Sequence, residues 1–179
     1  MNKILITAFE PFGTHKFLTL PVGGRNESRK MLRKLAANIS SERIIFMELE
    51  VNQAGIDRLN EVIRLHKPKG IFSMGEHAAI LSPNIEAYAN DVRRTSLPLF
   101  FKGNKRIMSK AAVALGADVN CSKIEAYYCN NVYLDSLKWV QVNGGHSVFL
   151  HLPVLNSSAK NYMQVEKLFK EFLTYVDRH

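Results

Sequence analysis

Residues 44–74, IIFMELEVNQAGIDRLNEVIRLHKPKGIFSM, decide the fold that the sequence predicts. The segment begins with an apolar run, 44–47, which is typical of a buried strand. Asn52 can then cap a helix with apolar side chains at helical spacing, which Pro68 and Gly70 end. A second apolar run, 70–74, follows at once. A strand, a helix and a strand in this order predict two parallel strands joined by a crossover helix.

The flanking sequence extends this pattern in both directions. Toward the N-terminus, residues 3–7 predict a strand and Asn26 can cap a helix that runs to about Ile39. Toward the C-terminus, the expected elements are a strand near 85–89, a helix from 126 or 129 to 142, a strand over 146–152 and a helix over 165–176. The alternation predicts an α/β fold, a three-layer α/β/α arrangement around a central, mostly parallel, twisted sheet.

Length and composition favour one domain spanning residues 1–179. The chain is 46% hydrophobic and 22% charged, which is ordinary for a globular protein. Two cysteines are too few for a disulfide framework, and the six histidines form no ligand-spaced pair, so we expect no metal and no cofactor. No apolar run suits a signal peptide or a membrane span, which favours a cytoplasmic protein with no membrane partner.

The formal net charge is +8, from 24 Lys and Arg against 16 Asp and Glu. Basic residues gather at 29–34, at helical spacing, and again at 93–110. They fit a solvated helix face and a basic loop. No aromatic residues interleave with them, and no helix-turn-helix motif is present, so we expect no nucleic-acid partner. A basic α/β domain that binds nucleic acid remains an alternative.

Three residues could carry chemistry. Cys129 begins a predicted helix, where the helix dipole would lower the pKa of a thiol, although a free cysteine can equally be a small buried hydrophobe. His151 ends a predicted strand, where ligands gather in parallel sheets, whereas His146 begins the same strand at the opposite end. Glu86 lies in an apolar stretch and could be a paired acid or an exposed carboxylate on an edge strand. Together they could supply a nucleophile, its base and the group that orients the base.

Four segments, in order along the chain, resemble motifs of the pyroglutamyl peptidase I (pyrrolidone-carboxylate peptidase) family. They are MNKILITAFEPFG (1–13), IEAYAN (85–90), YYCN (127–130) and FLHLP (149–153). The resemblance implies a hydrolase of the phosphorylase/hydrolase-like α/β/α fold. This thiol peptidase would remove N-terminal pyroglutamate from peptides. Homo-oligomers, dimers or tetramers, are also implied by the resemblance.

The resemblance also implies a role for each matching residue. Cys129 would attack the pyroglutamyl carbonyl, His151 would transfer the proton to the leaving amine, and Glu86 would orient His151. The phenylalanines Phe9 and Phe12 would hold the two faces of the lactam ring. Either Arg93 or Arg94 would lie near the oxyanion site.

The sequence departs from the family's pattern at residues 75–80, GEHAAI, where the family has Gly-x-Ala-Gly-Gly-Arg in a loop before the glutamate. Glycine lets a backbone approach a ligand more closely than alanine or isoleucine does. The alternative is therefore a catalytically weak or repurposed relative that binds a different small amide.

Overall fold

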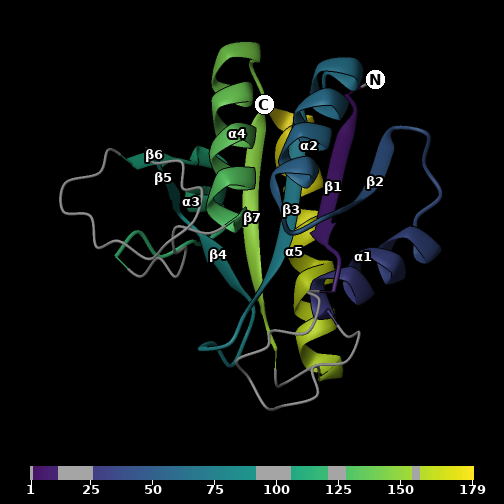
Figure 1. Ribbon diagram of the computed structural model, residues 1–179. Helices are drawn as coiled ribbons and strands as arrows, with labels where there is room; N and C mark the ends of the chain where they lie inside the picture. The colour runs from purple at the N-terminus through teal and green to yellow at the C-terminus, as the bar shows by residue number, and fades with distance from the viewer. Residues whose placement is uncertain (1, 12–25, 92–105, 121–127, 155–157) are drawn as a thin grey trace.

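The computed structural model describes residues 2–11, 26–91, 106–120, 128–154 and 158–179. Its central sheet has the strand order β2-β1-β3-β7-β4 (Figure 1). The first four strands are parallel, and β4 joins β7 antiparallel. Their bounds are β1 Ile4–Phe9, β2 Ile44–Leu49, β3 Gly70–His77, β4 Asn84–Glu86 and β7 His146–Pro153.

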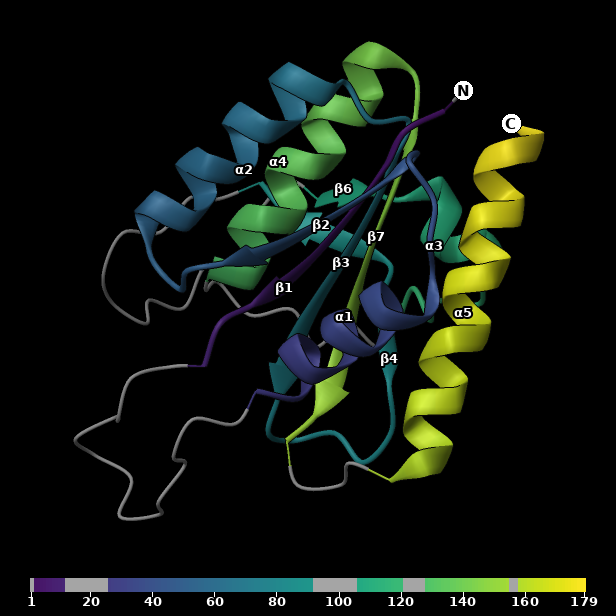
Figure 2. The same cartoon turned by 90° about the vertical axis from the view of Figure 1, so that its right-hand side faces the viewer.

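Helices cover both faces of the sheet (Figure 2). One face carries α2 (Gln53–His66) and α4 (Tyr128–Asn143), and the other carries α1 (Glu27–Asn38), α3 (Lys110–Ala114) and α5 (Ala159–Arg178). Each face has its own apolar cluster, and the side chains of β1 alternate between the two. Every residue of β1 is buried, as expected of a parallel strand packed on both faces. The predicted three-layer α/β/α fold is confirmed.

Two of the predicted helix starts are confirmed by their capping geometry. The side chain of Asn26 accepts a hydrogen bond from the backbone N–H of Arg29, and that of Asn52 accepts one from Gly55. These bonds satisfy N–H groups that have no partner inside the helix. The α2 helix ends at Lys67, which adopts a left-handed conformation with φ 47° before Pro68.

The strand predicted near 85–89 is in fact two short strands in different sheets. β4 belongs to the central sheet, whereas β5 (Tyr88–Asn90) pairs antiparallel with β6 (Arg106–Met108). The chain leaves the central sheet at Ala87, whose carbonyl accepts a hydrogen bond from the backbone of Ser109. Pairing across such a break depends on distant segments, so local periodicity could not reveal it.

The basic residues of α1 form ion pairs with neighbouring elements. Arg29 and Arg33 both bind the carboxylate of Glu48, at 2.7 and 2.8 Å. Lys30 pairs with Glu27 within α1, and Lys34 pairs with Glu166 of α5 at 2.8 Å. Much of the positive charge on this helix is therefore balanced locally.

None of the helices in the described part of the chain combines the length and apolar character that crossing a bilayer requires.

The Asn52→Ala variant tests the contribution of the α2 cap. It should lower the free energy of unfolding by about 1 kcal/mol, because the Gly55 amide loses its acceptor. Urea unfolding monitored by circular dichroism measures this change. The adjacent Gln53→Ala substitution, at the first helical residue, is the matched control and should cost less than half as much. Equal stability of Asn52→Ala and the native protein would contradict the role of the cap.

Candidate active site

The candidate catalytic residues lie near the carboxyl ends of β3 and β7. These strands pair in parallel, with Gly75 opposite His151. β4 flanks β7 on its other side, with Asn84 opposite His151 and Glu86 opposite Phe149. Residues opposite each other in a sheet, and residues two apart on one strand, present their side chains to the same face. The four side chains Asn84, Glu86, Phe149 and His151 therefore share the face that α4 covers.

Glu86 and His151 form a buried pair. The Nδ1 atom of His151 lies 2.8 Å from Oε1 of Glu86. Glu86 is fully buried and His151 is 2% exposed, although β4 is an edge strand. The backbone carbonyl of Glu86 accepts a hydrogen bond from the hydroxyl of Tyr133 on α4, at 2.8 Å. The helix thus covers the carboxylate that sequence reasoning left open as an exposed group.

The tautomer of His151 follows from this pair. A carboxylate has no proton to give, so the ring nitrogen facing it must be the donor. Nδ1 then carries the proton, and Nε2 is left as a hydrogen-bond acceptor. An imidazole held in this way is suited to take a proton from a neighbouring thiol or hydroxyl group.

Asn84 is a contributor to the site that the sequence did not reveal. Its Nδ2 donates to Oε1 of Glu86 at 3.1 Å, so that one oxygen accepts from both Asn84 and His151. Two donors lower the cost of burying the carboxylate. The spacing i, i+2 on one strand was the available signal, because it places Asn84 and Glu86 on the same face.

Cys129 is the second residue of α4, and its half-buried side chain packs against the core cluster beneath this helix. A Cβ atom added to Gly75 would lie 3.1 Å from the sulfur of Cys129 and 3.0 Å from Cζ of Phe149. The thiol therefore rests over the residue that pairs with His151 in the sheet. Asn130 fixes the start of α4, because its side chain exchanges two hydrogen bonds with the backbone of Asn90, at 2.8 and 3.0 Å.

The expectation that the helix start lowers the pKa of Cys129 is wrong in this structure. Burial of the thiol raises its pKa to about 12, and the negative charges of Glu86 and Glu76 act in the same direction. A hydrogen bond with its own backbone amide favours the thiolate, but is outweighed. Cys129 is therefore protonated at neutral pH, and a nucleophilic role requires a base.

The segment 75–80, expected as a loop, instead continues β3 for its first three residues. β7 remains the hydrogen-bonding partner as far as His77, which lies opposite Pro153. The ring of His77 packs on that of His151, with centroids 5.2 Å apart. Glu76 points to the opposite face, where its carboxylate accepts from the backbone N–H of Glu27 at the start of α1. The side chain of His77 thus lies beside His151.

Of the other residues assigned by resemblance, the structure describes only Phe9. Phe9 ends β1 and is 1% exposed, within the apolar cluster that also contains Phe149. Phe12, Arg93, Arg94 and the second cysteine, Cys121, lie outside the described residues. Among the described residues, no group of three or more His, Cys, Asp or Glu side chains could hold a metal ion.

Comparison with known proteins finds likeness at the level of the fold. No model of a protein family matches the chain, and no curated protein matches it. A solved pyrrolidone carboxyl peptidase from Thermococcus litoralis superposes with a TM-score of 0.74 and 17% identity, covering 99% of this chain and 96% of that one. Pyroglutamyl peptidase I from Bacillus amyloliquefaciens superposes with a TM-score of 0.69 and 16% identity, covering 100% of this chain and 97% of that one.

A mutant pyrrolidone carboxyl peptidase from Pyrococcus furiosus gives a TM-score of 0.69 and 18% identity, with 98% of each chain covered. The superpositions span nearly the whole chain. The chain has the fold of these peptidases, and the resemblance read from four short motifs is matched by the three-dimensional structure.

Alkylation of Cys129 tests the raised pKa of the thiol. Only the thiolate reacts, so labelling by iodoacetamide should be slow at pH 7 and should rise about tenfold per pH unit to pH 9. Mass spectrometry of peptides after timed quenching gives the rate at Cys129 separately from Cys121. A rate that is already high at pH 6 and constant to pH 8 would show a preformed thiolate and contradict this account.

Proposed function

We propose that this chain is a pyroglutamyl peptidase, a hydrolase that removes N-terminal pyroglutamate from peptides. The observation that carries the proposal is the buried Glu86–His151 pair, which faces the same helix, α4, that bears Cys129. The fold shared with pyrrolidone carboxyl peptidases supports it. A cytoplasmic location and a homodimer or homotetramer belong to the same proposal, by analogy with the family.

The proposed mechanism begins with proton transfer. Nε2 of His151 takes the proton of the Cys129 thiol as the sulfur attacks the carbonyl carbon of the pyroglutamyl residue. The imidazolium, stabilised by the carboxylate of Glu86, then gives its proton to the departing amine of the peptide. Water, deprotonated by His151, hydrolyses the remaining thioester and releases pyroglutamate. A protonated thiol at neutral pH fits this order, in which the base acts during attack.

Substrate recognition in this proposal follows the family resemblance. Phe9 and Phe12 hold the lactam ring, whose apolar faces suit aromatic contact. The resemblance assigns Arg93 or Arg94 to the oxyanion. Backbone N–H groups in the first turn of α4 are without helical acceptors and can also stabilise the negative oxygen.

A second candidate function is that of a repurposed relative that binds a different small amide. The observation that favours it is His77, whose ring contacts His151 where the family has a small residue. Such a protein would keep the buried pair and the thiol, yet would not fit the pyroglutamyl ring. Binding of nucleic acid is disfavoured, because the basic side chains of α1 are already ion-paired.

Hydrolysis of a pyroglutamyl-aminocoumarin reporter tests the proposed function. The native protein should release the fluorophore, and Cys129→Ala should abolish turnover because it removes the sulfur that forms the thioester. Glu86→Gln should keep the fold but lower kcat by roughly 10²- to 10⁴-fold, since an amide stabilises the imidazolium less and can select the wrong tautomer. The exposed Glu61→Gln on α2 is the matched control and should leave kcat unchanged.

Two results would contradict the assignment. Full activity of Glu86→Gln would remove this carboxylate from the mechanism, and activity of Cys129→Ala would remove the nucleophile.

Stepwise restoration of the family pattern tests the effect of residues 77–80. His77→Ala, Ala78→Gly, Ala79→Gly and Ile80→Arg together should raise kcat/KM for the reporter by up to about a hundredfold, because a displacement of the carbonyl by 1 Å can cost this much. His77→Ala alone should give part of the gain. Unchanged kcat/KM would show that this segment does not limit catalysis. If neither form cleaves the reporter while Cys129 is alkylated as expected, the repurposed relative is the better account.

A further inference from the structure

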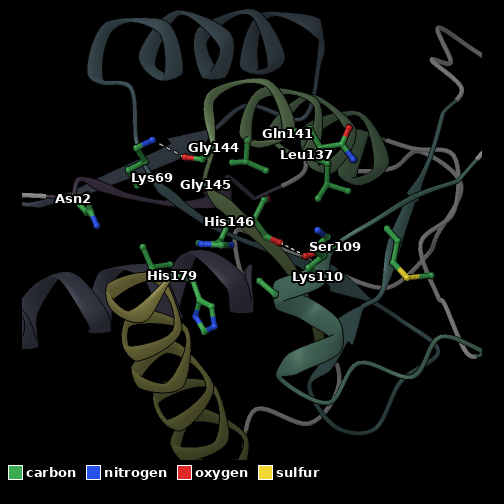
Figure 3. Close-up of a pocket in the computed structure, with 15 residues that line it drawn as sticks. Asn2, Lys69, Ser109, Lys110, Leu137, Gln141, Gly144, Gly145, His146 and His179 are labelled. Atoms are coloured by element: carbon green, nitrogen blue, oxygen red, sulfur yellow. Dashed lines mark hydrogen bonds between the residues drawn. The ribbon is translucent and has the colours of Figure 1, made fainter.

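A cavity lies where β7 begins, at the other end of this strand from His151. Figure 3 shows the side chains that line it. It has a volume of about 720 Å³ and is enclosed by the C-terminal half of α4, the start of β7, α3 and the last turn of α5. His146 at its centre is five residues from His151, which corresponds to about 16 Å along an extended strand. The cavity is therefore separate from the candidate active site.

The cavity exists because β4 is short. β4 pairs with β7 only over residues 149–151, and the rest of the β7 edge has no strand beside it among the described residues. There the hydroxyl of Ser109, the N-cap of α3, donates to the backbone carbonyl of Ser147 and ties α3 to β7. The space between the two helices is the cavity.

Its lining is basic. Lys69, Lys110, His146 and His179 take part in the lining, and no Asp or Glu does. Nζ of Lys69 donates to the carbonyls of Asn143 and Gly144, at 2.9 and 2.7 Å, and has a third proton left over. These bonds fix the ammonium group at the rim.

The nearest acidic side chain of α5 is already engaged. Asp177 forms two hydrogen bonds with the guanidinium of Arg43, at 2.6 and 2.9 Å. No ion pair joins Lys110 to an acidic group in the described part of the chain. The cavity lining thus contains no acidic side chain.

The pKa of His146 reflects the excess of positive charge around the cavity. Its pKa is lowered by burial and by the positive charges of His179 and Lys69. The other groups that face it are the ring of Tyr175, with centroids 4.9 Å apart, and the ammonium of Lys110 across the cavity. An anion placed here would favour the protonated imidazole, so it should bind more tightly as the pH falls from 8 to 6.

We propose that this cavity binds a small organic anion, with a carboxylate or phosphate group held by Lys110 and His146. Apolar side chains from α4 and α5 complete the lining, so the ligand carries a short apolar body that lies against Leu137, Val140 and Val176. The site does not include Cys129, His151 or Glu86, and it does not depend on the proposed peptidase function.

Calorimetric titration with phenyl phosphate, benzoate and the neutral analogue benzamide tests the proposal. At least one of the two anions should bind one per chain with a Kd below about 1 mM, and benzamide should bind at least tenfold more weakly. Whichever anion binds more tightly identifies the charged group that the site prefers. Affinity should increase between pH 8 and pH 6.

Variants locate the binding in this cavity. Lys110→Met and His146→Phe should each weaken the anion at least fivefold, whereas Lys167→Met, an exposed lysine elsewhere on α5, should not. Absence of binding at millimolar anion, equal binding of benzamide, or affinity unchanged in both Lys110→Met and His146→Phe would overturn the proposal.

Discussion

The carboxylate of Glu86, buried beneath α4, is the constraint on which the site depends. A charge withdrawn from water is tolerated only where donors surround it, and here His151 and Asn84 both bind the same oxygen. Those donors are available because β4 adds antiparallel to β7 in one register, which sets Asn84 opposite His151. A shift of β4 by one residue would turn Glu86 to the other face of the sheet. The antiparallel edge strand is therefore part of the site.

The parallel pairing of β3 with β7 places Gly75 opposite His151. Gly75 faces the thiol of Cys129. Because glycine has no Cβ atom, α4 can lie close to the strands here. The same closeness removes water from the sulfur and raises its pKa to about 12. Burial thus protects the thiol and makes it dependent on a base, which in the proposed function is the histidine held by Glu86. The basic cavity at the other end of β7 is far enough away to bind its ligand without altering this arrangement.

The features that local sequence could predict are those set by neighbouring residues. Apolar runs located the parallel strands, and Asn26 and Asn52 marked the starts of α1 and α2 through bonds that span three residues. His151 could be placed at a strand end by the same reasoning. The split of residues 84–90 between two sheets and the direction of the Cys129 pKa could not be predicted, because each depends on contacts with residues distant in the sequence. The helix dipole at Cys129 is local, whereas the burial that outweighs it is not.

The central claim is that Glu86 holds His151 with the proton on Nδ1 and leaves Nε2 free to accept one. Nitrogen-15 NMR of the histidine side chains, with His151 assigned through His151→Gln, reads the tautomer directly. The account predicts that the neutral form of the His151 ring has a protonated Nδ1 and an unprotonated Nε2, and that Glu86→Gln disturbs this signal while the exposed Glu61→Gln does not. A proton on Nε2 with a bare Nδ1 in the native protein would contradict it, because the ring would then have no acceptor to offer the thiol.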